Sequence, residues 1–181
     1  MFFTRIPVNW SYFSDKAPDL TNAAWTFPLI GFIIGFLSGG IGDWFLSLGL
    51  SIFLSSVISI TISVLLTGAF HEDGLADTSD GLGAGGSEKK INRIIHDSRL
   101  GTYGVVALVL GLLLRLGLII SLAEMGYSLI SILSIGFASG KIAIIFSRNL
   151  FSHSKFAKTG TIVKKISNKN LLIAILIWIV P

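Results

Sequence analysis

Long apolar runs separated by short polar segments dominate the hydrophobicity pattern of the chain. Four of these runs reach the roughly twenty residues that a helix needs to cross a bilayer: 27–48, 50–70, 104–123 and 128–146. A fifth run, 171–180, has about half that length and is followed directly by Pro181. The pattern predicts an all-α fold, a polytopic transmembrane helix bundle with four full spans and a partial fifth. We expect residues 1–181 to form a single integral membrane domain. The short fifth run is what a chain truncated at its carboxyl end would show.

Basic residues are distributed unevenly among the segments that join these runs. The connections after the first and third runs hold almost no charge, whereas segment 71–103 holds four Lys or Arg residues. Further basic residues precede the first run and follow the fourth. Because cytoplasmic loops are enriched in Lys and Arg, we expect the amino terminus and segment 71–103 to face the cytoplasm. Residues 1–7 lack the basic and then apolar pattern of a leader, so we expect no signal peptide.

The composition supports a membrane protein and narrows its chemistry. Hydrophobic residues make up 52% of the chain and charged residues 13%, with a mean hydropathy of +0.79, whereas soluble domains carry about 25% charged residues. The absence of cysteine excludes disulfides and thiolate ligands, which leaves oxygen or imidazole groups to hold a metal. The net charge of +4 is explained by the basic flanks of the apolar runs, so we expect no nucleic-acid partner.

The chemically most informative segment is 71–81, which holds four of the ten acidic residues. Asp73, Asp77 and Asp80 are spaced i, i+4, i+7, so on a helix they would form one stripe. Carboxylates that lie this close repel one another unless a cation lies among them. Oxygen ligands favour Mg²⁺, or alternatively Mn²⁺, and Mg²⁺ often joins carboxylates to substrate phosphates. The stripe therefore predicts a metal site; the alternative is a solvated helix end whose acids pair with the basic residues of 89–93.

A second polar block, 93–104, precedes the third run. Arg93 and Asp97 are one helical turn apart, which by itself is typical of an intrahelical ion pair worth a few tenths of a kcal/mol, on the order of 0.2–0.5. On the same membrane face as the acidic stripe, Asp97 becomes a candidate fourth metal ligand. Arg93 and Arg99 become candidate phosphate clamps.

Three further residues are candidates for a functional role. Arg115 and Lys141 lie inside apolar runs, where each costs roughly 2.5–3.5 kcal/mol on insertion, so we expect them to face the bundle interior. Lys141 could also snorkel towards the cytoplasmic side, and both interpretations stay open. His71 could act as a general base or as a hydrogen-bonding helix-end group, and no H-E-x-x-H pair surrounds it.

Glycines within the first and third runs, Gly31, Gly35, Gly39 and Gly111, favour an interpretation as packing sites, since small residues let membrane helices approach closely.

The two polar blocks resemble the signature segments of a known family. The blocks are His71-x-Asp73-Gly74-Leu75-Ala76-Asp77-Thr78-x-Asp80-Gly81 and Asp97-Ser98-Arg99-x-Gly101-Thr102-x-Gly104. Segments 4–8 and 27–31 give supporting matches, whereas beyond residue 146 the match weakens. On these residues the chain resembles the cobalamin synthase family (adenosylcobinamide-GDP ribazoletransferase, also called cobalamin 5′-phosphate synthase).

The resemblance implies a multi-pass enzyme of the bacterial or archaeal inner membrane that acts late in vitamin B12 assembly. It would join α-ribazole, or its 5′-phosphate, to adenosylcobinamide-GDP and release GMP with Mg²⁺, its active site facing the cytoplasm within segment 71–103. The implied metal ligands are Asp73, Asp77, Asp80 and Asp97. One of these carboxylates or His71 would be the base. The implied substrate-binding residues are Arg93, Arg99, Ser98, Gly74, Gly81, Gly101, Thr102 and Lys141.

Two other functions remain open at this point. A CDP-alcohol phosphotransferase of phospholipid synthesis would use similar metal chemistry, and the acidic block loosely resembles that family's motif. A small membrane transporter would line its path with Arg115 and Lys141, although the acids gather at one membrane face. The number of metals, the form of the acceptor and the formation of a homo-oligomer also remain open.

Overall fold

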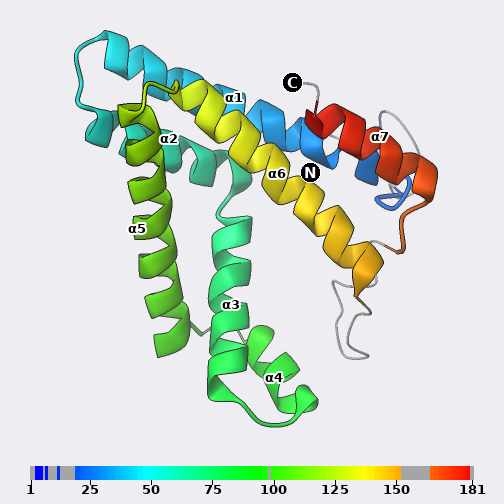
Figure 1. The fold of residues 1–181 in the computed structure, drawn as a ribbon. Helices are drawn as coiled ribbons and strands as arrows, with labels where there is room; N and C mark the ends of the chain where they lie inside the picture. Colours follow the sequence, from blue (N-terminus) through cyan, green and yellow to red (C-terminus); the bar gives the residue numbers. More distant parts are fainter. Residues whose placement is uncertain are drawn as a thin grey trace.

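The computed structural model describes residues 3–5, 7, 12, 19–97, 99–151 and 164–179. These residues fold into helices joined by short turns, and no strand occurs among them, which confirms the predicted all-α class. In chain order (Figure 1) the elements are η2 (Ala24–Thr26), α1 (Phe27–Ser47), α2 (Ile52–Thr67), α3 (Phe70–Ala84), α4 (Glu88–Ile95), α5 (Thr102–Glu124), α6 (Leu129–Leu150) and α7 (Asn168–Ile179).

The helices that could cross a membrane correspond only in part to the predicted spans. Within the described residues three helices are long and apolar enough: Ala24–Ser47, α5 and α6. The pair α2 and α3 makes a fourth crossing only if the two are counted together, and they meet at an angle of 86°. Helix α7 has 12 residues, so it forms the predicted partial run and not a full span. The prediction of four full spans is thus confirmed for three, with the fourth divided.

The division of the predicted second span, 50–70, has a local cause. Helix α2 ends at Thr67, and Gly68 and Ala69 both adopt left-handed backbone, with φ of 65° and 58°. Two successive left-handed residues cannot continue a right-handed helix. The chain therefore turns sharply, and the acidic segment begins a separate helix, α3.

Helices α1 and α6 form the tightest pair of the fold. They run antiparallel, and a Cβ added to Gly31, Gly35 or Gly39 would overlap the main chain of α6. These glycines therefore serve the predicted packing role. Asp43, near the end of α1, accepts hydrogen bonds from the backbone N–H of Leu129 and Ile130, at 2.9 and 3.0 Å, and so caps the start of α6.

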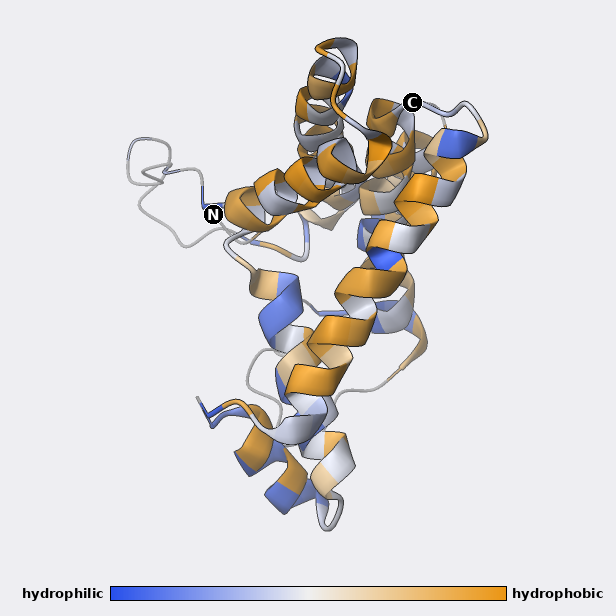
Figure 2. Ribbon diagram, turned by 90° about the vertical axis from the view of Figure 1, so that its left-hand side faces the viewer, coloured by the Kyte–Doolittle hydropathy of each residue, from blue (hydrophilic) through white to orange (hydrophobic). Residues whose placement is uncertain are grey.

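Helices α3 and α5 form a second antiparallel pair. The axes of this pair lie at a steep angle to those of α1 and α6 (Figure 1). Most residues of the long helices are hydrophobic, whereas hydrophilic residues gather on α3 and α4 (Figure 2). Polar chemistry is thus concentrated where α3, α4 and the beginning of α5 meet.

Candidate active site

Helix α3 carries the acidic stripe as predicted, but the three carboxylates lie in different surroundings. Asp73 is exposed, Asp77 is partly buried, and Asp80 is only 8% exposed. Among the described residues, the side chains of Asp73 and Asp77 form no hydrogen bond or ion pair. The alternative, in which these acids pair with the basic residues of 89–93, is therefore not observed there. Two carboxylates one helical turn apart are thus left for a ligand.

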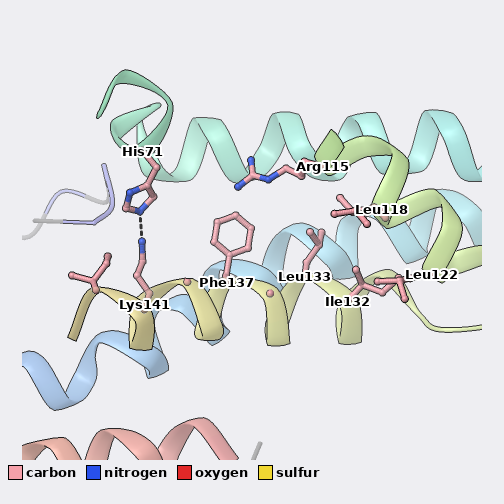
Figure 3. Close-up of a pocket in the computed structure, with 12 residues that line it drawn as sticks. His71, Arg115, Leu118, Leu122, Ile132, Leu133, Phe137 and Lys141 are labelled. Atoms are coloured by element: carbon pink, nitrogen blue, oxygen red, sulfur yellow. Dashed lines mark hydrogen bonds between the residues drawn. The ribbon is translucent and has the colours of Figure 1, made fainter. Parts of the chain in front are cut away.

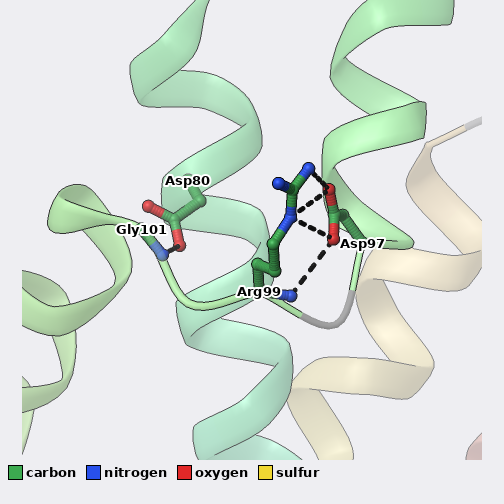
Figure 4. A network of polar contacts seen from close by, with 4 residues as sticks. All are labelled: Asp80, Asp97, Arg99 and Gly101. Atoms are coloured by element: carbon green, nitrogen blue, oxygen red, sulfur yellow. Dashed lines mark hydrogen bonds and ion pairs between the residues drawn. The ribbon is translucent and has the colours of Figure 1, made fainter.

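Both carboxylate oxygens of Asp80 accept hydrogen bonds, and Figure 4 shows the one with Gly101. Its Oδ2 accepts from the backbone N–H of Gly101 at 2.7 Å, and its Oδ1 accepts from that of Gly104 at 2.8 Å. Gly101 is the N-cap residue of α5 and has no side chain with which to cap the helix itself. The Asp80 carboxylate takes over that role from a neighbouring helix.

Asp97 and Arg99 form an ion pair at the turn before α5 (Figure 4). Arg99 Nη2 donates to Asp97 Oδ2 at 2.7 Å, and the backbone N–H of Arg99 donates to Oδ1 at 3.2 Å. These hydrogen bonds lower the pKa of Asp97 below its ordinary value. Since α4 ends at Ile95, the interpretation of Arg93 and Asp97 as an intrahelical pair is wrong.

A cleft of about 480 Å³ brings together several of the predicted site residues. It is lined by Ala69, Glu72, Asp73, Ala76, Asp77, Ile95, His96, Asp97, Arg99, Leu100 and Leu108. Asp73 and Asp77 thus share one cavity with the Asp97–Arg99 pair, as the placement of the two blocks on one membrane face predicts. We call this cavity the acidic cleft. Asp80 and Arg93 are not part of its lining.

The predicted glycine, serine and threonine sites lie in varied places. A Cβ on Gly101 would overlap the Asp80 carboxylate, and a Cβ on Gly81 would come within 2.6 Å of Ile95, so both glycines permit close packing. Gly74 faces open space, and Thr102 is exposed in the first turn of α5. Ser98 lies outside the described residues. Their predicted contacts with substrate stay predictions.

His71, Arg115 and Lys141 surround a second cavity of about 490 Å³ between α3, α5 and α6. Figure 3 shows His71 and Arg115 on one side of it, with Phe137 and Lys141 on the other. Lys141, 2% exposed, forms a short hydrogen bond with His71 Nε2. Its Nζ also lies 4.2 Å from the centre of the Phe3 ring. The expected interior position of Lys141 is thus confirmed, and His71 lies outside the acidic cleft.

Arg115 likewise faces the interior as expected, and its partner is a residue that the sequence analysis missed. Its Nη1 donates to Glu72 Oε1 at 3.1 Å, and its guanidinium lies 5.2 Å from the Phe137 ring centre. The available signal was Arg115 itself, because a charge inside a span usually has a counter-ion. The other oxygen, Glu72 Oε2, is buried without a partner among the described residues.

The arrangement fits a metal that is completed by its substrate and does not fit a closed protein cage. Among the described residues, no three His, Asp or Glu side chains converge as a ready-made metal site. Mg²⁺ is commonly held by one or two carboxylates together with phosphates and water. Asp73 and Asp77 supply such a pair, whereas Asp80 is engaged by backbone N–H groups and Asp97 by Arg99.

The chain can now be compared with known proteins. A family model described as Cobalamin-5-phosphate synthase matches residues 1–181, so the match extends well beyond residue 146, where the sequence comparison weakened. Three relatives are each named adenosylcobinamide-GDP ribazoletransferase. The protein of Shewanella halifaxensis is 38% identical over 96% of this chain and 68% of its own length. The protein of Azorhizobium caulinodans is 40% identical over 80% of this chain and 58% of its own length. The protein of Shewanella sp. W3-18-1 is 47% identical over 67% of this chain and 46% of its own length.

In these alignments the chain spans between 46% and 68% of the relatives' lengths. No solved structure matches the chain significantly. The family resemblance inferred from the two polar blocks is confirmed by the match over the whole chain. The chain belongs to the cobalamin-5-phosphate synthase family.

Proposed function

We propose that the protein is a Mg²⁺-dependent transferase that joins α-ribazole, or its 5′-phosphate, to adenosylcobinamide-GDP and releases GMP. The observation that carries the proposal is the acidic cleft, in which two unpaired carboxylates, Asp73 and Asp77, share one cavity with Arg99. The relatives' name supports the choice of substrates. Family membership favours this function over a CDP-alcohol phosphotransferase and over a small transporter.

The residues of the cleft divide the work of such a transfer. Asp73 and Asp77 would hold Mg²⁺, with Mn²⁺ as a substitute; when bound, the metal supplies charge neutralisation for a diphosphate. Arg99 can donate two N–H groups to phosphate oxygens, and Asp97 orients its guanidinium. The residues of the cleft thereby position the phosphate and limit the repulsion of an incoming nucleophile.

The bond changes follow from the substrates. The acceptor hydroxyl forms a P–O bond to the phosphate attached to cobinamide, the bond between the two phosphates breaks, and GMP leaves with that electron pair. The hydroxyl proton passes to a carboxylate of the cleft, because His71 lines the other cavity.

We place the acidic cleft on the cytoplasmic side of a bacterial or archaeal inner membrane. Helix α4, which packs on α3 beside the cleft, carries Lys89, Lys90 and Arg93 with exposed side chains. Basic residues next to membrane spans favour the cytoplasmic side. A nucleotide substrate from the cytoplasm would reach the cleft from that side.

The test is GMP release from adenosylcobinamide-GDP by the chain reconstituted in liposomes. Reactions with and without α-ribazole phosphate and Mg²⁺ are run beside an Asp73→Asn variant and the longer Shewanella halifaxensis protein as a positive control. Release that requires both additions and vanishes in Asp73→Asn supports the proposal. No release from this chain under conditions where the control protein is active would contradict it.

A further inference from the structure

We infer that Asp80 is a positioning residue that fastens the start of α5 to α3 and holds the Asp97–Arg99 turn against the acidic cleft. The inference separates Asp80 from Asp73 and Asp77, although all three belong to one acidic stripe. What Arg99 does for a phosphate rests on the proposed function. The capping itself does not.

The first argument is the hydrogen-bonding demand at the start of α5. The first backbone N–H groups of a helix have no partner within the helix, and an anion there also interacts favourably with the helix dipole. Asp80 meets this demand with both oxygens, one on Gly101 and the other on Gly104, at 2.7 and 2.8 Å. Because Asp80 is 8% exposed and is not part of the cleft lining, its oxygens are not presented to a ligand there.

The second argument is the shape of the receiving surface. A Cβ on Gly101 or on Gly104 would overlap the Asp80 carboxylate, so this approach requires glycine at both positions. A similar close approach occurs one turn further along α3, where a Cβ on Gly83 would overlap the Tyr103 ring. Gly101 and Gly104 thus form a cradle for the Asp80 carboxylate between α3 and α5.

The third argument is a second example in the same molecule. Asp43 of α1 accepts from the first backbone N–H groups of α6, those of Leu129 and Ile130. Asp43 does not line the acidic cleft, so an aspartate caps a helix here without belonging to that site. The fold thus uses an aspartate from a preceding helix to fix the start of α5 and of α6 alike.

The consequence for the site follows from chain connectivity. The contact of Asp80 with Gly101 closes a loop that includes α4 and the turn carrying Asp97 and Arg99. Without it, the start of α5 would lose its cap and its hydrogen bonds to α3, and the turn would be less restrained although Tyr103 and Arg115 still contact α3. Arg99 would then spend less time facing Asp73 and Asp77 across the cleft.

The test compares Asp80→Asn with Asp73→Asn in the reconstituted protein by hydrogen exchange of the peptide that contains the amides of residues 101–104. Our inference predicts faster exchange of this peptide in Asp80→Asn and unchanged exchange in Asp73→Asn. The same peptide should also exchange faster in Gly104→Ala, which keeps the Asp80 carboxylate but displaces it. The inference can therefore still be tested if one of the two variants folds poorly. Unchanged exchange in both Asp80→Asn and Gly104→Ala would overturn the inference.

A second readout separates positioning from metal binding. The Mg²⁺ concentration that gives half-maximal GMP release should be the same in Asp80→Asn as in the unmodified protein, while the KM for adenosylcobinamide-GDP rises in Asp80→Asn. A rise of about tenfold or more in the Mg²⁺ requirement of Asp80→Asn would make Asp80 a metal ligand and overturn the inference. Because exchange is measured without substrate, a failure of the proposed transferase would leave the first test intact.

Discussion

The two antiparallel helix pairs, α1–α6 and α3–α5, share the same contact at one end and differ in the contacts along the rest of their length. Each is fastened at one end by an aspartate of the first helix that accepts from backbone N–H groups of the second. Beyond the cap, α1 presents glycines that press directly against the main chain of α6. Beyond its cap, α3 presents Leu75 against Gly111 and then the Glu72–Arg115 ion pair.

This difference explains where the site can be. Close glycine packing leaves no room for a ligand between α1 and α6, and it makes that pair a rigid support. Bulkier and charged contacts hold α3 and α5 further apart, and the acidic cleft and the second cavity both open beside α3. We therefore expect changes in the first pair to affect folding and changes in the second to affect chemistry.

The largest effect should come from Gly35→Leu, which places a side chain where the α6 main chain already lies. The loss should exceed the about 1–3 kcal/mol that overpacking costs in soluble cores, because the overlapped atoms are main chain and α1 and α6 could no longer pack at their present distance. We expect loss of monodisperse protein after detergent extraction, measured by size-exclusion chromatography. Gly117→Leu is the matched control, because nothing lies within 4 Å of that position among the described residues. Equal recovery of both variants would contradict the tight-pair description.

A smaller loss of stability should follow Glu72→Gln, which leaves Arg115 without its carboxylate. Breaking a buried ion pair typically costs about 3–5 kcal/mol, and the partial exposure of Arg115 favours the low end. Unfolding of the detergent-solubilised protein measures the change. The double variant Glu72→Gln/Arg115→Met should recover much of the loss, and strictly additive effects would show that the two side chains do not interact.

Arg99→Lys should leave the fold intact and weaken substrate binding. Lysine cannot reproduce the forked geometry of the guanidinium, and a hydrogen bond to a charged group is worth about 1.5–3 kcal/mol. We expect the KM for adenosylcobinamide-GDP to rise by about tenfold, which corresponds to about 1.4 kcal/mol. Lys89→Gln, a charge change on exposed α4, is the control and should leave KM unchanged. A similar rise in both variants would indicate a general electrostatic effect.

The smallest effect concerns pH. Because Arg99 lowers the pKa of Asp97, the carboxylate is ionised above its ordinary pKa of about 3.9, and the pair is lost only as the pH falls through the lowered value. The ratio of KM in Asp97→Asn to KM in the unmodified protein should therefore stay constant between about pH 5 and 8. A ratio that changes across this range would show that Asp97 titrates there.

The sequence allowed the helices and the acidic stripe to be predicted because both depend on local spacing. Hydrophobic runs locate α1, α5 and α6 to within a few residues, and the i, i+4, i+7 spacing places Asp73 and Asp77 on one face. The turn at Gly68 and Ala69 was missed, because alanine gives no local signal for left-handed backbone.

Contacts between residues far apart in the chain were also missed. Asp43 was not singled out, since its partners lie more than eighty residues later. Asp80 was grouped with the other acids because its distinguishing feature, the start of α5, is brought to it only by the fold. Glu72 could have been inferred from the need of Arg115 for a counter-ion.

The central claim is that the α3–α5 pair carries the chemistry and the α1–α6 pair the support. Its most direct test is GMP release measured side by side in Asp73→Asn and Asp43→Asn, at equal amounts of folded protein and saturating Mg²⁺. We predict that release is abolished in Asp73→Asn and retained in the Asp43→Asn protein that folds. Release at the unmodified rate in Asp73→Asn, or its loss in folded Asp43→Asn alone, would contradict the account.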